Sequence, residues 1–133
     1  MEVKILNLLN EGASNLSLLQ EKKICKFVLV ATEDELNLVF GSFTRYPYHA
    51  NLVDLFCHRR EIPSAWVNKP DLVEIIDAAY QIRGGGWLEI DPPKGTLKFF
   101  GESTVYGRFA QSDLNHVLTE NELFADFQAV VRH

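Results

Sequence analysis

Two apolar segments separated by four polar residues constrain the fold more than any other feature of this sequence. Residues 25–31 (CKFVLVA) and 36–43 (LNLVFGSF) are rich in β-branched and aromatic side chains, which favour strands. The sequence between them, TEDE, is a polar turn. The two segments therefore predict a β-hairpin, which a chain of 133 residues can bury within a single domain.

Helical and extended patterns alternate after the hairpin. Apolar side chains at three- and four-residue spacing predict helices over residues 48–60 (with Pro47 suited to the first turn), 70–79 and part of 108–119. Extended patterns occupy residues 80–90, 96–100 and 124–131, and residues 62–69 and 92–95 are predicted to be a loop and a tight turn.

No βαβ repeat is evident in this order of elements. The sequence therefore predicts an α/β fold of the α+β kind, with a single domain over residues 23–133 and a mixed sheet flanked by two or three helices. Residues 1–22 form an N-terminal arm that adds either a short helix or an edge strand.

Charge and composition exclude several classes of protein. There are 13 Lys and Arg residues against 18 Asp and Glu, which argues against nucleic-acid or membrane partners. No apolar run approaches the roughly 20 residues of a membrane span, and no signal peptide is evident. Cys25 and Cys57 form neither a CxxC pair nor a disulfide framework, so we expect two reduced cysteines in a cytoplasmic protein.

His49 is the first candidate for chemistry because it lies at the predicted start of a helix. The positive end of a helix dipole disfavours the imidazolium form, so a histidine there stays neutral and can accept a proton near pH 7. Spacing alone favours the alternative, a histidine that packs or caps the helix.

Two glycine-containing segments are further candidates. Gly84, Gly85 and Gly86 interrupt an extended pattern, which indicates a bulge or sharp bend, or close approach of the backbone to a ligand or another chain. The loop 101–107 offers hydroxyls and free backbone N–H groups, as an anion nest before a helix does, although an ordinary turn with a capping serine fits equally.

Metal and cofactor chemistry have little support in the sequence. His49, Cys57 and His58 lie on one predicted helix at offsets that give no i, i+4 pair, so no metal site is predicted. Cys57 lacks a surrounding phosphate loop and is a weak candidate for a nucleophile. The loop 101–107 lacks the lysine of a P-loop, and no cofactor is expected.

Four short motifs occur in an order that resembles the protein histidine phosphatase family, also called the Janus/Ocnus family. The resemblance covers roughly residues 24–119. The motifs are Lys26-Phe27-Val28-Leu29, Tyr48-His49-Ala50, Gly84-Gly85-Gly86 and Gly101-x-Ser103-x-x-Tyr106-Gly107.

This resemblance implies a fold, an activity and a site. The fold is a mixed sheet flanked by two helices, and the activity is metal-independent hydrolysis of phosphohistidine or a related phosphoramidate. The substrate would be a phosphorylated protein or a small phosphoramidate. The implied roles are a general base (His49), phosphate contacts (Lys26, Ser103, Thr104, Val105, Tyr106) and supporting positions (Tyr48, Gly84, Gly85, Gly86, Arg45).

The chain departs from the family pattern in ways that keep alternatives open. Trp87 and Gly41 stand where the family often has basic residues, Glu102 adds a negative charge, and residues 61–71 are an insertion. A non-catalytic module that binds anions or phosphopeptides, or a different hydrolase on the same fold, fits these departures.

Three expectations follow for the site. Phosphatase activity requires positive charge from Arg45, Arg83 or Arg108 in space. The imidazole of His49 should lie near the 103–106 loop, within reach of the water that it activates. The N–H groups of Thr104, Val105 and Tyr106 should be free for phosphate.

Overall fold

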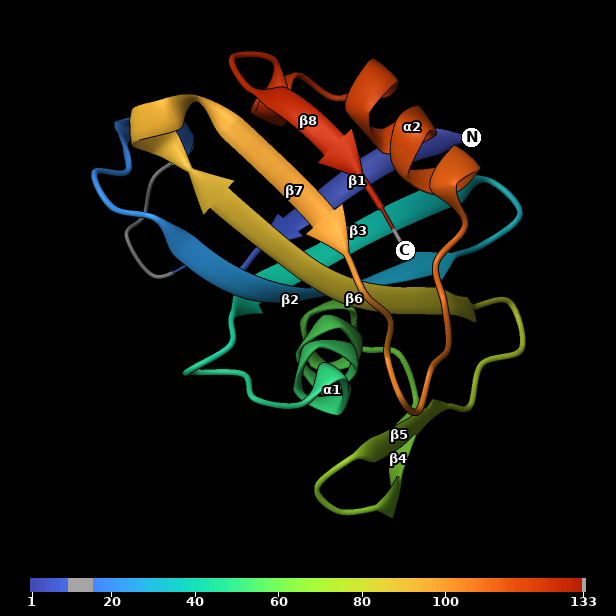
Figure 1. Ribbon diagram of the computed structural model, residues 1–133. Coiled ribbons are helices and arrows are strands. Elements are labelled where there is room, and N and C mark those ends of the chain that lie inside the picture. Colours follow the sequence, from blue (N-terminus) through green and yellow to red (C-terminus); the bar gives the residue numbers. More distant parts are fainter. Residues whose placement is uncertain (10–15, 133) are drawn as a thin grey trace.

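A curled six-stranded mixed sheet forms the centre of the computed structural model, which describes residues 1–9 and 16–132 (Figure 1). The strand order is β1-β3-β2-β6-β7-β8. Neighbouring strands are antiparallel except at the two edges, where β1 is parallel to β3 and β8 is parallel to β7. The strands are β1 (Glu2–Asn7), β2 (Lys23–Ala31), β3 (Glu35–Ser42), β6 (Gln81–Asp91), β7 (Thr96–Phe100) and β8 (Gln128–Val131).

One α-helix covers each face of this sheet. Helix α1 (His49–Arg60) packs on one face and α2 (Gln111–Glu120) on the other (Figure 1). A separate two-stranded ribbon, β4 (Ser64–Asn68) and β5 (Leu72–Ile75), lies beside α1. Three short 3₁₀ turns complete the described elements: η1 (Leu16–Leu18), η2 (Pro92–Lys94) and η3 (Glu122–Phe124).

The central strands are apolar on both faces because the sheet separates two cores. Successive side chains of a strand point to opposite faces. Phe27 and Leu29 of β2 therefore enter the core under α2, whereas Val28 and Val30 enter the core under α1. All four side chains are fully buried. This explains why residues 25–31 read as a continuous apolar run rather than as an alternating one.

The predicted α+β fold with a mixed sheet and two helices is confirmed. The hairpin of residues 25–31 and 36–43 corresponds to β2 and β3, and the predicted helices at 48–60 and 108–119 correspond to α1 and α2. Of the alternatives for the N-terminal arm, β1 is an edge strand and η1 a single short turn. The final strand is shorter than predicted, because η3 and the turn that follows it occupy residues 122–127.

The predicted helix over residues 70–79 is wrong, and the predicted loop at 62–69 contains a strand. Residues 72–75 form β5, which pairs with β4. Val73 points inward and is 1% exposed, while Glu74 points outward. The β-branched residues in the sequence LVEI suit a pleated surface. Hairpin pairing with residues 64–68 therefore outweighs the three- and four-residue spacing of apolar side chains.

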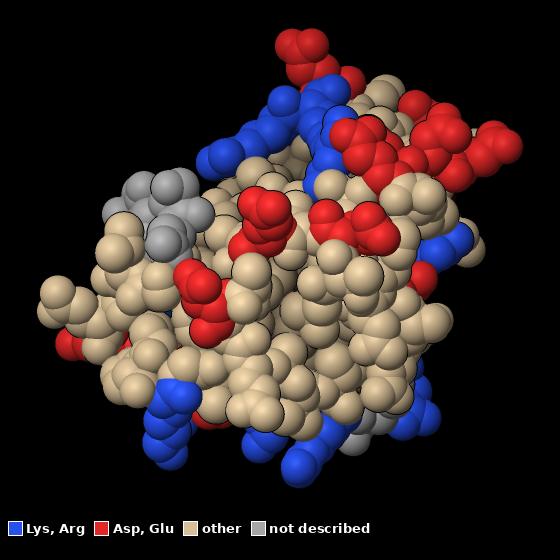
Figure 2. All heavy atoms as spheres, turned by 90° about the horizontal axis from the view of Figure 1, so that it is seen from above, with Lys and Arg blue, Asp and Glu red and all other residues tan. Residues whose placement is uncertain are grey.

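The surface and the helices agree with the composition. Lysine and arginine side chains occur alongside aspartate and glutamate on the face seen in Figure 2, and a large part of that face is uncharged. Within residues 1–9 and 16–132, neither helix has the length and apolar character needed to cross a bilayer.

Candidate active site

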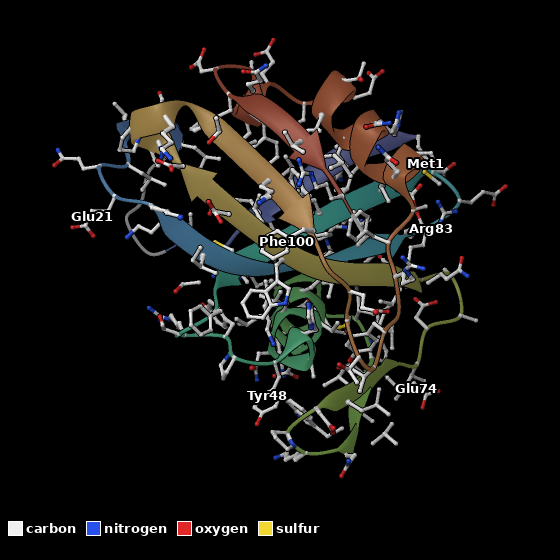
Figure 3. All side chains as sticks on the ribbon, viewed as in Figure 1. Met1, Glu21, Tyr48, Glu74, Arg83 and Phe100 are labelled. Atoms are coloured by element: carbon white, nitrogen blue, oxygen red, sulfur yellow. The ribbon has the colours of Figure 1, made fainter. Side chains whose placement is uncertain are left out.

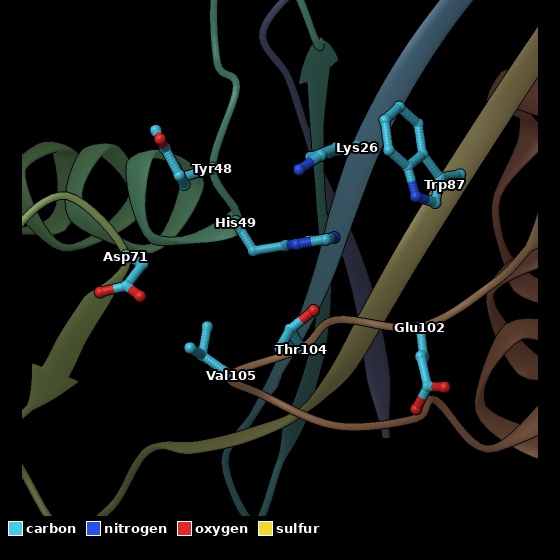
Figure 4. Close-up of a pocket in the computed structure, with 8 residues that line it drawn as sticks. All are labelled: Lys26, Tyr48, His49, Asp71, Trp87, Glu102, Thr104 and Val105. Atoms are coloured by element: carbon cyan, nitrogen blue, oxygen red, sulfur yellow. The ribbon is translucent and has the colours of Figure 1, made fainter.

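A cavity of about 380 Å³ lies at the N-terminal end of α1, where the helix meets β2, β6 and the 101–107 loop. It brings together residues from three of the four sequence motifs, the residue that follows the glycine triplet, and the end of the β4–β5 turn (Figure 4). The lining residues are Lys26, Tyr48, His49, Asp71, Trp87, Glu102, Thr104 and Val105.

His49 is buried at the inner wall of this cavity and is fixed in one orientation. The residue is 6% exposed, and its Nε2 lies 2.9 Å from the backbone oxygen of Gly86. A carbonyl oxygen only accepts, so Nε2 carries the proton and donates it. The neutral ring therefore holds its lone pair on Nδ1. The structure thus assigns the tautomer that a base acting through Nδ1 needs.

The glycine triplet makes room for this imidazole and for a crossing segment. A side-chain Cβ at Gly85 would collide with the Phe27 carbonyl and lie 3.1 Å from Cδ2 of His49. Gly84 has a φ of +92°, and the Arg108 carbonyl passes against it. The β2–β6 register also shifts opposite this point, between Val28 and Val30. The bulge that the sequence indicates is therefore present, and the groups that come close to the glycines are Phe27, His49 and Arg108 of the same chain.

Burial keeps His49 neutral. The pKa of the imidazole is lowered from 6.5 to about 4: burial is the largest cause, the bond to Gly86 opposes it, and the Lys26 charge adds to the lowering. The sequence predicted a neutral histidine from the helix dipole. In the structure, loss of solvation is the largest cause.

The start of α1 is held by a hydrogen bond that turns the chain into the helix. The backbone N–H of Tyr48 donates to Oδ1 of Asn51 at 3.0 Å. Asn51 thus satisfies an N–H that a helix start would otherwise leave to solvent. Tyr48 itself is 42% exposed and lies at the cavity rim. Its backbone, rather than its ring, positions His49.

Lys26 is the cation of the cavity and is held between two groups. Its Nζ donates to the Pro47 carbonyl at 2.6 Å and lies 4.9 Å from the centroid of the Trp87 ring. Burial lowers the pKa of Lys26. Because an ammonium has three donors, one bond to Pro47 leaves donors for a ligand.

The 101–107 loop presents two free N–H groups rather than three. Thr104 and Val105 make no backbone hydrogen bond within the described part of the chain. The N–H of Tyr106 donates to Oγ of Ser103 at 3.1 Å, so the expectation for Tyr106 is wrong. Ser103 and Gly107 also exchange two backbone bonds of 3.2 and 2.8 Å, which close the loop.

Ser103 and Tyr106 support the loop and do not line the cavity. Ser103 is 1% exposed, and its hydroxyl accepts from Tyr106. The Tyr106 hydroxyl donates to the Val73 carbonyl at 2.7 Å and accepts from the Val73 N–H at 2.9 Å, and burial raises its pKa to about 12. The motif serine and tyrosine thus shape the loop that carries Thr104 and Val105.

The arginines that the phosphatase interpretation required are not in the cavity. Arg45 and Arg108 are exposed and do not line it. Arg83 pairs with Asp113 at 3.3 Å, away from Tyr48 at the cavity rim (Figure 3). Asp71 and Glu102 line the cavity instead, so one lysine faces two carboxylates.

The sequence does not reveal that Asp71 lines the cavity, nor how Trp87 packs there. Asp71 is the last residue of the predicted insertion and reaches the cavity only because residues 64–75 fold as a hairpin. Trp87 lies directly opposite Lys26 in the β2–β6 register, a pairing that a sequence without known strand register does not reveal.

The other sequence candidates lie elsewhere. Cys57 is a buried residue of α1, and burial raises the pKa of its thiol, which disfavours the thiolate. Within residues 1–9 and 16–132, no three histidine, cysteine or carboxylate side chains cluster as metal ligands would.

Comparison with known families gave one match. The sequence model of the Janus/Ocnus family (Ocnus) matches residues 17–128, which is most of the chain and includes every lining residue of the cavity. Comparison with curated proteins gave no match.

Proposed function

Because the chain belongs to the Janus/Ocnus family, we propose that it is a metal-independent phosphatase that hydrolyses phosphohistidine or a related phosphoramidate. His49 is the general base. Lys26 and the N–H groups of Thr104 and Val105 hold the phosphoryl oxygens.

The bond between His49 and Gly86 carries this proposal. It fixes the neutral tautomer with Nδ1 as the acceptor, in a cavity that also holds an ammonium and two free N–H groups. A base and anion donors in one water-accessible cavity are the parts that phosphoryl transfer to water needs.

The reaction runs in one displacement. A water oxygen attacks phosphorus while its proton passes to Nδ1 of His49. The P–N bond breaks, and its electron pair returns to the nitrogen of the leaving group, which takes a proton from solvent. Inorganic phosphate and the free amine or imidazole are the products, and His49 then returns its proton to solvent.

The low pKa of His49 suits this base in one respect and limits it in another. At a pKa of about 4 the ring is unprotonated at neutral pH, yet it is a weak proton acceptor. A bound phosphoryl group carries negative charge, which raises the pKa of a nearby imidazole. Substrate binding therefore strengthens the base at the time that it is used.

The charge of the cavity favours a second candidate, the non-catalytic binding module. One lysine against two carboxylates leaves little net attraction for a phosphoryl dianion. A module of this kind would hold a phosphopeptide weakly, mainly through backbone N–H groups, and would release it unchanged.

Hydrolysis of phosphoramidate by the purified protein separates the two candidates. We expect hydrolysis that persists in a chelator and falls about 10²–10⁴-fold in His49→Ala, the usual contribution of a general base. His58→Ala, on the exposed side of the same helix, is the matched control and should keep full activity. Lys26→Met should mainly raise KM, because a point cation acts on ground and transition states alike.

Two results would contradict the proposal that this protein is a metal-independent phosphatase. Binding of phosphate without any hydrolysis, with His49→Ala equal to wild type, would favour the binding module. Activity that a chelator abolishes would contradict the metal-independent mechanism.

A further inference from the structure

We propose that the indole N–H of Trp87 is a phosphoryl-binding donor. The inference rests on the proposed function, since it names a further binding residue of the same site. It concerns the indole N–H that, among the described residues, lines the cavity.

The strand register places Trp87 beside the parts of the site already described. Trp87 and Lys26 are direct partners across β6 and β2, so their side chains leave the sheet next to each other on one face. Gly85, over which the His49 ring lies, is two residues earlier on the same face. Two strand residues span about 6.7 Å, which leaves room for a phosphoryl group between imidazole and indole.

Packing on several sides fixes the indole. Lys26 Nζ lies over the ring, the Phe43 ring centroid is 5.6 Å away, and a Cβ at Gly101 would lie 3.0 Å from Cδ1 of Trp87. A side chain held in this way loses little freedom when it binds a ligand. Trp87 is therefore preorganised as a donor.

The indole nitrogen has no partner among the described residues. No hydrogen bond joins Nε1 of Trp87 to residues 1–9 or 16–132, and no fully buried side-chain nitrogen or oxygen there lacks a partner. Nε1 must therefore be accessible, and Trp87 lines the cavity. In Figure 4 the nitrogen-bearing edge of the ring is on the side nearer to His49 and Glu102.

A neutral donor also fits the charge of this cavity. An indole N–H can only donate, and it binds a phosphoryl oxygen without adding charge. With Lys26 as the cation and with Asp71 and Glu102 also lining the cavity, hydrogen bonds rather than net charge hold the ligand. The site should therefore bind the singly charged form of phosphate more tightly than the doubly charged form.

Indole resonances in ¹H–¹⁵N NMR spectra test the proposal directly, with inorganic phosphate as the probe. The chain has two tryptophans, and Trp66 lies on β4 outside the cavity, where it serves as an internal control. We expect phosphate to shift the Trp87 indole proton downfield together with the amides of Thr104 and Val105. The Trp66 signal should not move.

Two variants give the matching affinities. Trp87→Phe keeps a ring against Lys26 and Phe43 but removes the N–H, and should raise the Kd for phosphate roughly tenfold. Glu102→Gln should lower it several-fold by removing a nearby negative charge. Wild-type affinity should be higher at pH 5.5 than at pH 8, because phosphate then carries one charge.

The outcomes separate this inference from the proposed function. If Thr104 and Val105 shift while the Trp87 indole does not, and Trp87→Phe binds as wild type, the indole donor is refuted and the anion site stands. If none of the three responds, the anion site fails, and with it both the proposed function and this inference.

Discussion

Replacing His49 by glutamine should remove a steep dependence of stability on pH. The imidazole is 6% exposed, and its pKa is about 4 in the folded protein against 6.5 in the unfolded chain. Between these two values the unfolded chain binds more protons than the folded protein. Stability therefore rises with pH across this window and is lost as the pH falls from about 6.5 to about 4.

The size of this effect follows from the width of the window. One pKa unit corresponds to about 1.4 kcal/mol, so a window of about 2.5 units gives roughly 3 kcal/mol. A domain of this size is typically stable by about 5–15 kcal/mol, so the loss is a large share of the total. Glu35 does not affect the pH dependence of stability over most of this window, because its bonds to Lys4 and Arg60 lower its pKa from 4.5 to about 2. The stability that Glu35 contributes is lost only when the pH falls below about 4.5.

Urea unfolding at several pH values between 7.5 and 4.5 measures the effect. Wild-type protein should lose most of the roughly 3 kcal/mol over this range, whereas His49→Gln should lose that much less, because an amide takes up no proton. His58→Gln is the matched control, since that side chain is 73% exposed and loses little solvation on folding. It should retain the steep profile of the wild type.

Parallel profiles for wild type and His49→Gln would refute the reasoning. They would mean that His49 takes up its proton equally in both states, so that the ring is not held neutral by burial. The NMR titration of the His49 ring protons gives an independent reading, with a midpoint expected near 4.

Two further substitutions test how the site is positioned. Gly85→Ala should destabilise the fold by several kcal/mol in urea unfolding and displace His49, because the new methyl group meets the Phe27 carbonyl and the imidazole. Gly95→Ala is the control: nothing lies within 4 Å of the new methyl group, so the substitution should cost only about 1 kcal/mol, which comes from the positive φ of this residue. Tyr106→Phe should lower the free energy of unfolding by about 1–3 kcal/mol, because the N–H and the carbonyl of the buried Val73 both lose their partner. It should also speed amide exchange across the 101–107 loop. Unchanged stability and exchange would show that the tyrosine does not anchor the loop.

The elements of the central sheet could be predicted because local signals and burial agree there. Residues 25–31 and 36–43 are β-rich and joined by a short polar turn, and both become central strands. The helix of residues 49–60 follows a proline and has its apolar side chains at helical spacing. Where secondary-structure propensity, the hydrophobic pattern and the turn residues all favour one structure, tertiary packing does not change it.

The segment 62–79 shows where prediction from the sequence fails. Its apolar spacing fits a helix, but its β-branched residues find a partner strand and an anchor in the hydroxyl of Tyr106, which lies far away in sequence. Local patterns carry no information on such a partner. As a result, the place of Asp71 beside the cavity was also out of reach.

The sequence by itself determined the kind of chemistry, because residue types and motif order are local: a histidine at a helix start, a lysine on a strand, a glycine triplet and a glycine-bounded loop. Only the tertiary structure decided which groups act together. It buries His49 and fixes its tautomer on Gly86, turns Ser103 inward to hold its own loop, keeps the three arginines out of the cavity, and sets Trp87 opposite Lys26. Solvation, tautomer and net charge at a site depend on every group that packs around it, and those neighbours come from strands and loops distant in the chain.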